Sequence, residues 1–405
     1  MKILIINTFY YPTFIGGAEI SVQLLAENLV KEGNRVFIFC NGPQNRVYRV
    51  NNVIVISCKQ RNLFTNYGGA GATKLSKILW HLIDSCNPFY HFKLLSILKK
   101  KKPQVVHTNN IQGFSPFVWL TVKSTKTPLV HTIRDYYLLC HKSNMFNNNK
   151  NCTRLCTECK ITNSIKSRFI NYPNHFIGIS KYITTVHADF FPTRKRNFSV
   201  VYNAAAANKF PVTHSESEIV VFGYIGRIEK DKGVEYLANE LANLNADNKL
   251  SFKILFAGKG EDIFITQLKE KLAGTHFEFL GVVQPADFFS KIDVLLVPAL
   301  WNEPFGRTVI EALSFSIPVC HTDRGGLKEL YDPECAWMFT PEKGNLSKII
   351  SDIVENKAEL SSKKALLMNK LQNRFSTTNY INNYLSVYKR AIGGEEITSQ
   401  AILTE

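Results

Sequence analysis

Residues 292–326 read IDVLLVPALWNEPFGRTVIEALSFSIPVCHTDRGG and combine two strand patterns with a helix pattern. The apolar run at 292–299 is short and continuous, which is typical of a strand buried inside a parallel sheet. A helix is predicted from about Arg307, and an isoleucine-proline pair ends it before the next apolar run. Glu303 and Glu311 are separated by a proline and a glycine, so one belongs to a loop and the other to the helix.

The loop between this strand and this helix predicts a ligand site. It presents Glu303, Gly306 and the first free amides of the helix at the carboxyl end of the strand, where open α/β sheets bind ligands. Because a helix amino terminus favours anions, we expect a ligand that carries phosphate. The alternative is an ordinary strand-to-helix turn whose two glutamates are simply solvated.

Length and composition indicate a soluble globular protein of two domains. A chain of 405 residues exceeds one ordinary core, and two domains of somewhat under 200 residues each are expected. The chain has no run of eighteen apolar residues, and its amino terminus enters strand-like sequence directly. We therefore expect neither a membrane-spanning helix nor a signal peptide, and a cytoplasmic location.

The positive charge lies in the first half of the chain. Residues 1–200 contain 27 Lys and Arg against 7 Asp and Glu, a net +20, whereas the remainder contains 22 against 26, a net −4. Such a surface attracts anionic lipid, nucleic acid or an acidic substrate. Segment 74–102 has apolar residues at helical spacing and ends in four lysines, so it predicts either ordinary surface helices with solvated lysines or a patch that binds an anionic membrane.

Short apolar runs alternate with helical patterns in both halves, which predicts two doubly wound α/β domains. The predicted strands are 2–8, 35–40, 52–57, 104–110, 128–135, 175–180 and 198–203 in the first half, and 219–227, 252–261, 276–281, 292–299 and 317–323 in the second. The predicted domains are 1–205, with a Cys-rich insertion at 140–160, and 218–375, with a linker at 206–217. We expect a helix over 376–393 to pack back on the first domain, and 394–405 to be a frayed tail.

Two motifs in the second half carry a resemblance, GRIEKDKG at 226–233 and EPFGRTVIEA at 303–312. With them, the chain resembles the retaining glycosyltransferases of family 4 over nearly its whole length, from GGAE at Gly16 to the closing helix. The resemblance implies the GT-B fold, in which two Rossmann-like domains face a cleft and the last helix crosses back to the first domain.

The resemblance also implies an activity. It implies transfer of a sugar from a nucleotide-sugar donor, without a catalytic metal, to a lipid-linked or polysaccharide acceptor in cell-surface glycan synthesis, such as that of lipopolysaccharide. The basic first domain suits such an acceptor, so we expect a peripheral protein at the inner face of the cytoplasmic membrane.

The resemblance assigns donor-binding roles. Arg227 and Lys232 would hold the diphosphate, where two fixed cations stabilise the charge that grows on the leaving group. Glu303 would contact sugar hydroxyls and Glu311 would accept from the ribose. Backbone amides would face sugar or phosphate oxygens at Phe305, Gly306, Arg307 and Thr308. Gly16 and Gly17, which taken alone predict only a turn, would complete the phosphate site when the domains close.

The first domain departs from the family pattern where many members have T-x-H-D. Here HTIRD places Arg134 before Asp135. Arginine stays protonated and cannot act as a base, and His131 should point to the opposite face of the strand. We predict Arg134, Asp135 and Glu303 as the catalytic residues, with the departing phosphate oxygen taking the acceptor proton and Arg134 orienting the donor or an acidic acceptor. Because Arg134 stands where many members have histidine, the alternative is that this chain is a catalytically inactive relative of the family.

Four of the nine cysteines fall in the Asn- and Lys-rich insertion, at Cys140, Cys152, Cys156 and Cys159. Four thiolates would make a closed tetrahedral zinc site and order such a loop. Reduced thiols or a disulfide pair are the alternatives, although a disulfide is not expected in a reducing compartment. The other cysteines lie in apolar surroundings and are expected in the core.

Other functions stay open on sequence alone. A sugar-nucleotide epimerase or phosphorylase can share the fold. A non-enzymatic protein that binds nucleic acid or membrane would also explain the basic first half. Aromatic residues among the lysines of 89–102 are the only support for nucleic acid, and no recognition motif accompanies them, so nucleic acid is not an expected partner.

Overall fold

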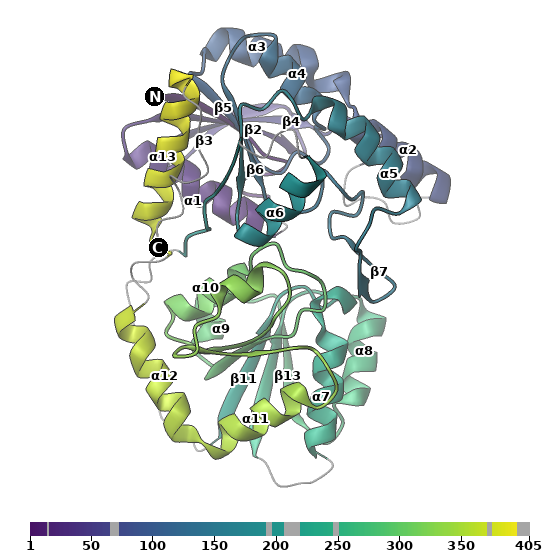
Figure 1. The fold of residues 1–405 in the computed structure, drawn as a ribbon, viewed down its shortest axis with the longest axis vertical. Coiled ribbons are helices and arrows are strands. Elements are labelled where there is room, and N and C mark those ends of the chain that lie inside the picture. Colours follow the sequence, from purple (N-terminus) through teal and green to yellow (C-terminus); the bar gives the residue numbers. More distant parts are fainter. Residues whose placement is uncertain are drawn as a thin grey trace. The chain divides into compact units, whose positions relative to one another are not determined.

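The computed structural model describes residues 1–13, 16–64, 73–191, 197–205, 219–245, 251–370 and 375–394 (Figure 1). The chain forms two compact units. Unit 1 consists of Met1–Met145, Thr153–Asn203 and Thr378–Glu405, and unit 2 of Phe146–Cys152 and Ala204–Thr377. The segment 146–152 thus belongs to unit 2, although the chain on both sides of it belongs to unit 1. The predicted linker at 206–217 and the predicted tail beyond 394 lie outside the described residues.

Unit 1 is built on an eight-stranded sheet with the order β10-β9-β6-β5-β1-β2-β4-β3. Neighbouring strands are parallel except for β3, which is antiparallel to β4 at the edge. The strands are β1 (Lys2–Ile6), β2 (Arg35–Gly42), β3 (Arg46–Val50), β4 (Val53–Lys59), β5 (Val105–Thr108), β6 (Leu129–Ile133), β9 (His175–Gly178) and β10 (Phe198–Val200). The central strands β1, β5, β6 and β9 are buried along nearly their whole length, as expected for a parallel sheet covered on both faces.

Helices connect these strands. They are α1 (Gly17–Lys31), α2 (Lys74–Ser85), α3 (His91–Lys101), α4 (Phe117–Lys123), α5 (Thr157–Lys166), α6 (Lys181–Phe190) and α13 (Thr377–Gly393), with the short turns η1 (Pro88–Tyr90) and η2 (Ser167–Phe169). None of the described helices is long and apolar enough to cross a membrane.

Helix α13 is held in unit 1 by three tyrosines at a spacing of four residues, which places them on one helical face. Tyr384 OH lies 3.1 Å from Thr132 Oγ1, and Tyr388 OH lies 2.7 Å from His107 Nδ1. Tyr380 donates to the backbone oxygen of Ser21 at 3.3 Å. All three rings are buried, so apolar contact and polar pairing both fix this helix.

Unit 2 contains a six-stranded parallel sheet with the order β13-β12-β11-β14-β15-β16. Its strands are β11 (Val220–Ile225), β12 (Phe252–Ala257), β13 (His276–Gly281), β14 (Val294–Val297), β15 (Val319–Thr322) and β16 (Ala336–Phe339). Its helices are α7 (Val234–Asn245), α8 (Asp262–Lys271), α9 (Pro285–Phe289), α10 (Arg307–Ser314), α11 (Asn345–Glu355) and α12 (Lys357–Lys370), with the turns η4 (Lys230–Lys232) and η5 (Gly326–Leu330). Figure 1 shows α7 and α8 on one side of this sheet and α9 and α10 on the other.

The predicted pair of doubly wound α/β sheets is confirmed. Not predicted were the edge strands β3 and β16 and the hairpin of β7 (Phe146–Asn147) and β8 (Lys150–Asn151). Strand β3 reads RVYRV and is mostly exposed, so it lacks the apolar run that marks a buried strand. The hairpin strands have only two residues each, too few for any periodicity.

Buried histidines make the stability of unit 1 depend on pH. Burial lowers the pKa of His131 to about 3 and that of His187 to about 4, and it holds the pKa of His107 well below its usual value. The folded protein therefore keeps these rings neutral, while the unfolded chain binds protons near pH 6.5. Because the unfolded state binds more protons below that pH, stability falls as the pH drops.

We expect acidification from pH 7 to pH 5 to destabilise unit 1 by about 2 kcal/mol for each such histidine. The His187→Leu variant, which fills the same space without titrating, should reduce the slope of stability against pH by about one proton. Denaturant unfolding followed at pH 5, 6 and 7 measures this slope. His276→Leu changes an exposed histidine of unit 2 and serves as the control. An unchanged slope in His187→Leu would show that this ring titrates alike in both states.

Candidate active site

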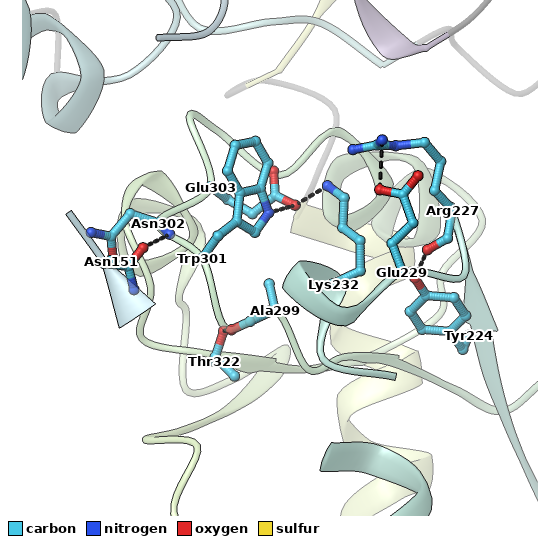
Figure 2. Close-up of polar contacts among 10 residues, drawn as sticks. All are labelled: Asn151, Tyr224, Arg227, Glu229, Lys232, Ala299, Trp301, Asn302, Glu303 and Thr322. Carbon is cyan, nitrogen blue, oxygen red and sulfur yellow. Dashed lines mark hydrogen bonds and ion pairs between the residues drawn. The ribbon is translucent and has the colours of Figure 1, made fainter. Parts of the chain in front are cut away.

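Lys232 and Glu303 form an ion pair beyond the carboxyl ends of the two central strands of unit 2 (Figure 2). Lys232 ends η4, which follows β11, and Glu303 lies in the loop after β14. Strands β11 and β14 are neighbours from which the sheet is extended in opposite directions, so their carboxyl ends form the switch point where doubly wound sheets bind ligands. Lys232 Nζ lies 2.5 Å from Glu303 Oε1, with both side chains at most 20% exposed.

Trp301 completes this group. Its indole nitrogen donates to the same Oε1 of Glu303 at 2.8 Å, and Lys232 Nζ lies 4.5 Å from the centre of its ring. Figure 2 shows the indole and the lysine converging on one edge of the carboxylate. Within the described part of the chain both contacts are made to Oε1, which leaves Oε2 as the oxygen that a ligand hydroxyl can approach.

Backbone contacts fix the loop that carries Glu303. The backbone oxygen of Asp231, in η4, accepts from the amides of Leu300 at 3.0 Å and Trp301 at 3.2 Å. The hydroxyl of Thr322 donates to the oxygen of Ala299 at 2.9 Å. Gly326 N donates to Glu303 O at 2.7 Å. The carboxylate therefore stands on a rigid loop, which is the condition for electrostatic preorganisation.

Asn151 supports the same loop from the β7–β8 hairpin. Its side-chain nitrogen donates to the oxygen of Leu300 at 2.8 Å, and its side-chain oxygen accepts from the amide of Asn302 at 2.7 Å. The two bonds engage the backbone on both sides of Trp301, as a neighbouring strand would. Figure 2 shows this contact at the end of the site opposite Arg227.

Two glycines allow the close approach of these segments. Gly233 follows Lys232 with φ +74°, and a Cβ there would lie 1.8 Å from the backbone oxygen of Pro298. Gly306 precedes α10 with φ +112°, and a Cβ there would lie 2.4 Å from Leu327. Positive φ and missing space together exclude a side chain at both positions. Since Gly306 has no side chain, no side-chain cap covers the amino terminus of α10.

Arg227 lies at the rim of the site. Its side chain is 53% exposed and forms a 2.6 Å ion pair with the exposed Glu229. The hydroxyl of Tyr224 donates to the backbone oxygen of Arg227 at 2.5 Å, which fixes the backbone but not the guanidinium. Exposed ion pairs contribute little stability, so the guanidinium can exchange Glu229 for an anionic ligand.

The remaining predicted residues of unit 2 surround α10. Arg307 Nε donates to Glu311 Oε1 at 2.7 Å, one helical turn away. Thr308 is half-buried in the first turn. The ring of Phe305 is buried and packs on Phe375, with 6.2 Å between ring centres, so only its backbone can face a ligand.

The candidates of unit 1 lie at the carboxyl ends of its strands. Gly16 caps α1, and its amide donates to Glu19 Oε2 at 2.9 Å; Gly17 is the first residue of that helix. The buried Arg134 donates from Nε to Asn109 Oδ1 and from Nη1 to Asn203 Oδ1, both at 2.9 Å. Burial raises the pKa of Asp135 to about 6, and its Oδ1 accepts from the amide of Tyr137.

Comparison with known proteins identifies the family. The model "Glycosyltransferase Family 4" matches residues 15–208, and "Glycosyl transferases group 1" matches residues 206–374. An uncharacterized 42.6 kDa protein in the cps region of Klebsiella pneumoniae is 34% identical over 341 residues, which are 82% of this chain and 87% of that protein. The solved structure of HepE from Anabaena in complex with UDP superimposes with a TM-score of 0.69 at 17% identity, over 96% of this chain and 100% of that one. The chain belongs to the family 4 glycosyltransferases of the GT-B fold.

A further relative of this glycosyltransferase is a capsular polysaccharide biosynthesis glycosyltransferase, CapM of Staphylococcus aureus. It is 27% identical over 170 residues, which are 39% of this chain and 42% of that protein. The family and fold that the two motifs predicted are thereby confirmed.

The structure brings together some predicted site residues and adds others. Lys232 and Glu303 are in contact, and Arg307 and Glu311 are in contact. Four of the predicted residues, Arg134, Asp135, Gly16 and Gly17, belong to unit 1. The other predicted catalytic and donor-binding residues belong to unit 2. Tyr224, Trp301 and Asn151 were not predicted as site residues. Trp301 stands beside the quoted motif, which was a usable signal, whereas Asn151 has none because it lies 151 residues from Asn302.

The predicted zinc ligands are only partly brought together. Cys140 and Cys159 form one group of potential metal ligands with His141, and Cys156 forms another with His141 and Glu158. Neither group includes Cys152, which lies in the segment that belongs to unit 2. The cysteines predicted for the core are buried, except for the half-buried Cys86; they are Cys40, Cys58, Cys86, Cys320 and Cys335.

We expect the Asn151→Ala variant of this glycosyltransferase to bind its donor about tenfold more weakly, because two hydrogen bonds to the backbone around Trp301 are lost. Titration calorimetry with UDP, the ligand in the HepE structure, together with the tryptophan fluorescence of the variant, measures the effect. Lys150→Ala changes the neighbouring exposed side chain of the same hairpin and is the control. Equal affinities for Asn151→Ala and Lys150→Ala would mean that the loop is rigid without the hairpin.

Proposed function

We propose that this glycosyltransferase moves a sugar from a nucleotide-sugar donor to a lipid-linked or polysaccharide acceptor, with retention of anomeric configuration, in the synthesis of a cell-surface glycan. The observation that carries the proposal is the ion pair of Lys232 and Glu303 beside Trp301, which joins the two sequence motifs at the switch point of the sheet. The UDP complex of HepE and the polysaccharide role in the name of CapM support the classes of donor and acceptor.

In the proposed complex, Lys232 and Arg227 hold the diphosphate. Lys232 Nζ is fixed by Glu303 and the face of Trp301, so its charge needs no reorganisation when negative charge grows on the leaving group. Arg227 exchanges its exposed partner Glu229 for a phosphate oxygen. The amino terminus of α10, open at Gly306, adds the partial positive charge of its first amides at Phe305 to Thr308.

Carboxylates orient the rest of the donor. Glu303 Oε2 accepts hydroxyl groups of the sugar, while Oε1 stays engaged with Lys232 and Trp301. Glu311 keeps Arg307 on one oxygen and accepts from the ribose on the other. For Gly16 and Gly17, at the amino terminus of α1, we propose backbone contacts with an anionic oxygen of the substrate.

The transfer needs no protein base in this proposal. The bond between the anomeric carbon and the phosphate oxygen breaks, and the acceptor oxygen bonds to the anomeric carbon on the same face. The departing diphosphate takes the acceptor proton. Arg134 acts as a positioning residue. Its Nε and Nη1 donate to the side chains of Asn109 and Asn203 and so fix these polar groups beside the end of the strand that leads to Asp135.

Separate binding assays for diphosphate and sugar test these roles. We expect uridine, guanosine or adenosine diphosphate to raise the melting temperature, and the nucleotide with the largest shift to identify the donor. Lys232→Ala should lower kcat about 10²- to 10³-fold, as does removal of other preorganised donors, and should abolish the shift with the diphosphate alone. Glu303→Gln should keep the diphosphate shift but lose the additional shift that the sugar brings.

Lys253→Ala breaks an exposed ion pair of unit 2, that of Lys253 and Glu278, and should change neither assay. If Lys232→Ala kept full turnover and full diphosphate binding, the ion pair would be structural and the proposed donor site would be wrong.

Unit 1 offers a surface suited to a membrane-bound acceptor. Helices α2 and α3, with η1 between them, expose large apolar side chains, among them Leu75 at 66% and Phe92 at 83%; the others are Ile78, Leu79 and Phe89. The same segment exposes Lys77, Lys93, Lys99, Lys100 and Lys102. Apolar side chains next to lysines fit the interface of an anionic bilayer, where each basic residue contributes about 1 kcal/mol.

We expect the full-length protein to co-sediment with vesicles that contain phosphatidylglycerol and not with vesicles of neutral lipid. Leu75→Ser combined with Phe92→Ser, or Lys99→Glu combined with Lys100→Glu, should weaken binding at least tenfold, because each pair of changes removes about 2 kcal/mol or more. Ile263→Ser combined with Val282→Ser, which replaces two exposed apolar side chains of unit 2, is the control. Binding to RNA in preference to these vesicles would overturn the membrane proposal.

A further inference from the structure

A group of thiols around one imidazole lies in unit 1, apart from the residues used above. Ligand atoms of Cys140, His141 and Cys159 lie within 4.8 Å of one another, and so do those of His141, Cys156 and Glu158. His141 Nδ1 lies 3.3 Å from Cys159 Sγ. A tetrahedral zinc ion, bonded to sulfur at about 2.3 Å and to nitrogen at about 2.0 Å, separates its ligand atoms by about 3.5 to 3.8 Å. The ligand atoms of Cys140, His141 and Cys159 are therefore already close to the spacing of a single-ion site, and Cys156 belongs to the second group around the same imidazole.

Local structure places the sulfurs. Cys156 is the residue before α5, and Cys159 follows three residues later in the first turn, so both sulfurs lie on one side of that helix. Cys140 ends a turn in which its own amide donates to Tyr136 O at 2.7 Å. The backbone amides of Lys142, Asn144 and Met145 donate to the Cys140 sulfur, so the loop holds this sulfur in place.

The imidazole is oriented as a zinc ligand is. Nδ1 of His141 faces Cys159, and Nε2 lies 3.4 Å from a carboxylate oxygen of Glu158. When a histidine binds a metal, its second nitrogen almost always donates to a carboxylate, a carbonyl or water, which fixes the tautomer. Glu158 supplies that carboxylate from the residue before Cys159. The ring of His81 packs edge-on against His141, with 5.0 Å between centres, and limits its rotation.

The loop between these ligands needs an additional constraint. Residues 140–159 contain four non-glycine residues in left-handed conformations, Ser143, Met145, Asn148 and Asn149. For Ser143 and Met145 this conformation costs about 1 kcal/mol or more each, whereas asparagine adopts it readily in hairpin turns. The strands β7 and β8 within the loop have only two residues each. An ion that joins Cys140 to Cys156 and Cys159 would close the loop at its base and offset these costs.

We propose that the thiolates of Cys140, Cys156 and Cys159 and Nδ1 of His141 bind one zinc ion, with Glu158 orienting His141. In this set His141 takes the place of Cys152, which was predicted from the sequence as the fourth ligand. Four protein ligands leave no open position, so the ion is structural and has no part in the transfer of the sugar. Thiols that still carry protons release them to the solvent on binding, and no oxidant is needed. The proposal is independent of the identity of the donor.

Elemental analysis of full-length protein, purified under reducing conditions from cells grown with added zinc, tests the proposal. We expect about one zinc per chain, and less than a tenth of an equivalent in Cys140→Ser and Cys159→Ser. His141→Asn should lower zinc affinity at least tenfold in competition with a chelator. Cys152→Ser and Cys86→Ser should retain one zinc, and Cys86→Ser is the matched control for the loss of a thiol elsewhere in unit 1.

The wild-type protein provides a second measurement if a serine variant fails to fold. Removal of zinc by a chelator should lower the melting temperature, and zinc should restore it. Cobalt in its place should give the absorption of a tetrahedral thiolate complex. Less than a tenth of an equivalent of zinc after reconstitution, or a disulfide between Cys140 and Cys159 in the reduced preparation, would overturn the site. Loss of zinc in Cys152→Ser with full retention in His141→Asn would overturn the role of His141 and restore the four-cysteine set.

Discussion

The ion pair of Lys232 and Glu303 is the interaction on which the site in unit 2 depends. Two opposite charges drawn partly out of water persist only where the backbone holds them in register, because desolvation opposes their attraction. That register comes from the sheet, where β11 and β14 are hydrogen-bonded neighbours, and from Asp231, whose backbone oxygen binds the loop after β14. Gly233 lets the two segments touch. Sheet topology, loop geometry and charge thus all determine the position of this ion pair.

Most of the fold could be predicted from the sequence because its strands are continuous apolar runs separated by helical patterns. The family could be predicted because two motifs each follow a strand: GRIEKDKG in the loop after β11, and EPFGRTVIEA across the end of the loop after β14 and the start of α10. What could not be predicted depends on distant partners. Asn151 meets Leu300 and Asn302, and the partners of Arg134 at Asn203 and Tyr380 are 69 and 246 residues away. No local pattern encodes such pairs, since only the folded chain brings them together.

The two units use polar groups in different ways. Unit 2 keeps its charges in pairs that a ligand can exchange, as at Arg227 and Glu229. Unit 1 contains buried charged groups, and burial favours their neutral forms. It raises the pKa of Asp84 to about 6 and lowers that of Lys166 to about 8. Lys166 Nζ donates to Tyr137 O at 2.6 Å and lies 3.6 Å from the centre of that ring. A network of this kind fixes the position of strand ends more than it attracts a substrate.

The hairpin at 146–152 interrupts unit 1 in sequence while belonging to unit 2. A chimaera that joins the first half of this chain to the second half of a relative would carry a foreign hairpin against the loop around Trp301. Asn151 would then meet the loop of another protein in place of the backbone of Leu300 and Asn302, even though the fusion point lies far away. Recombination between relatives therefore has to exchange two pieces together, the hairpin and the second sheet, if the loop is to keep its shape.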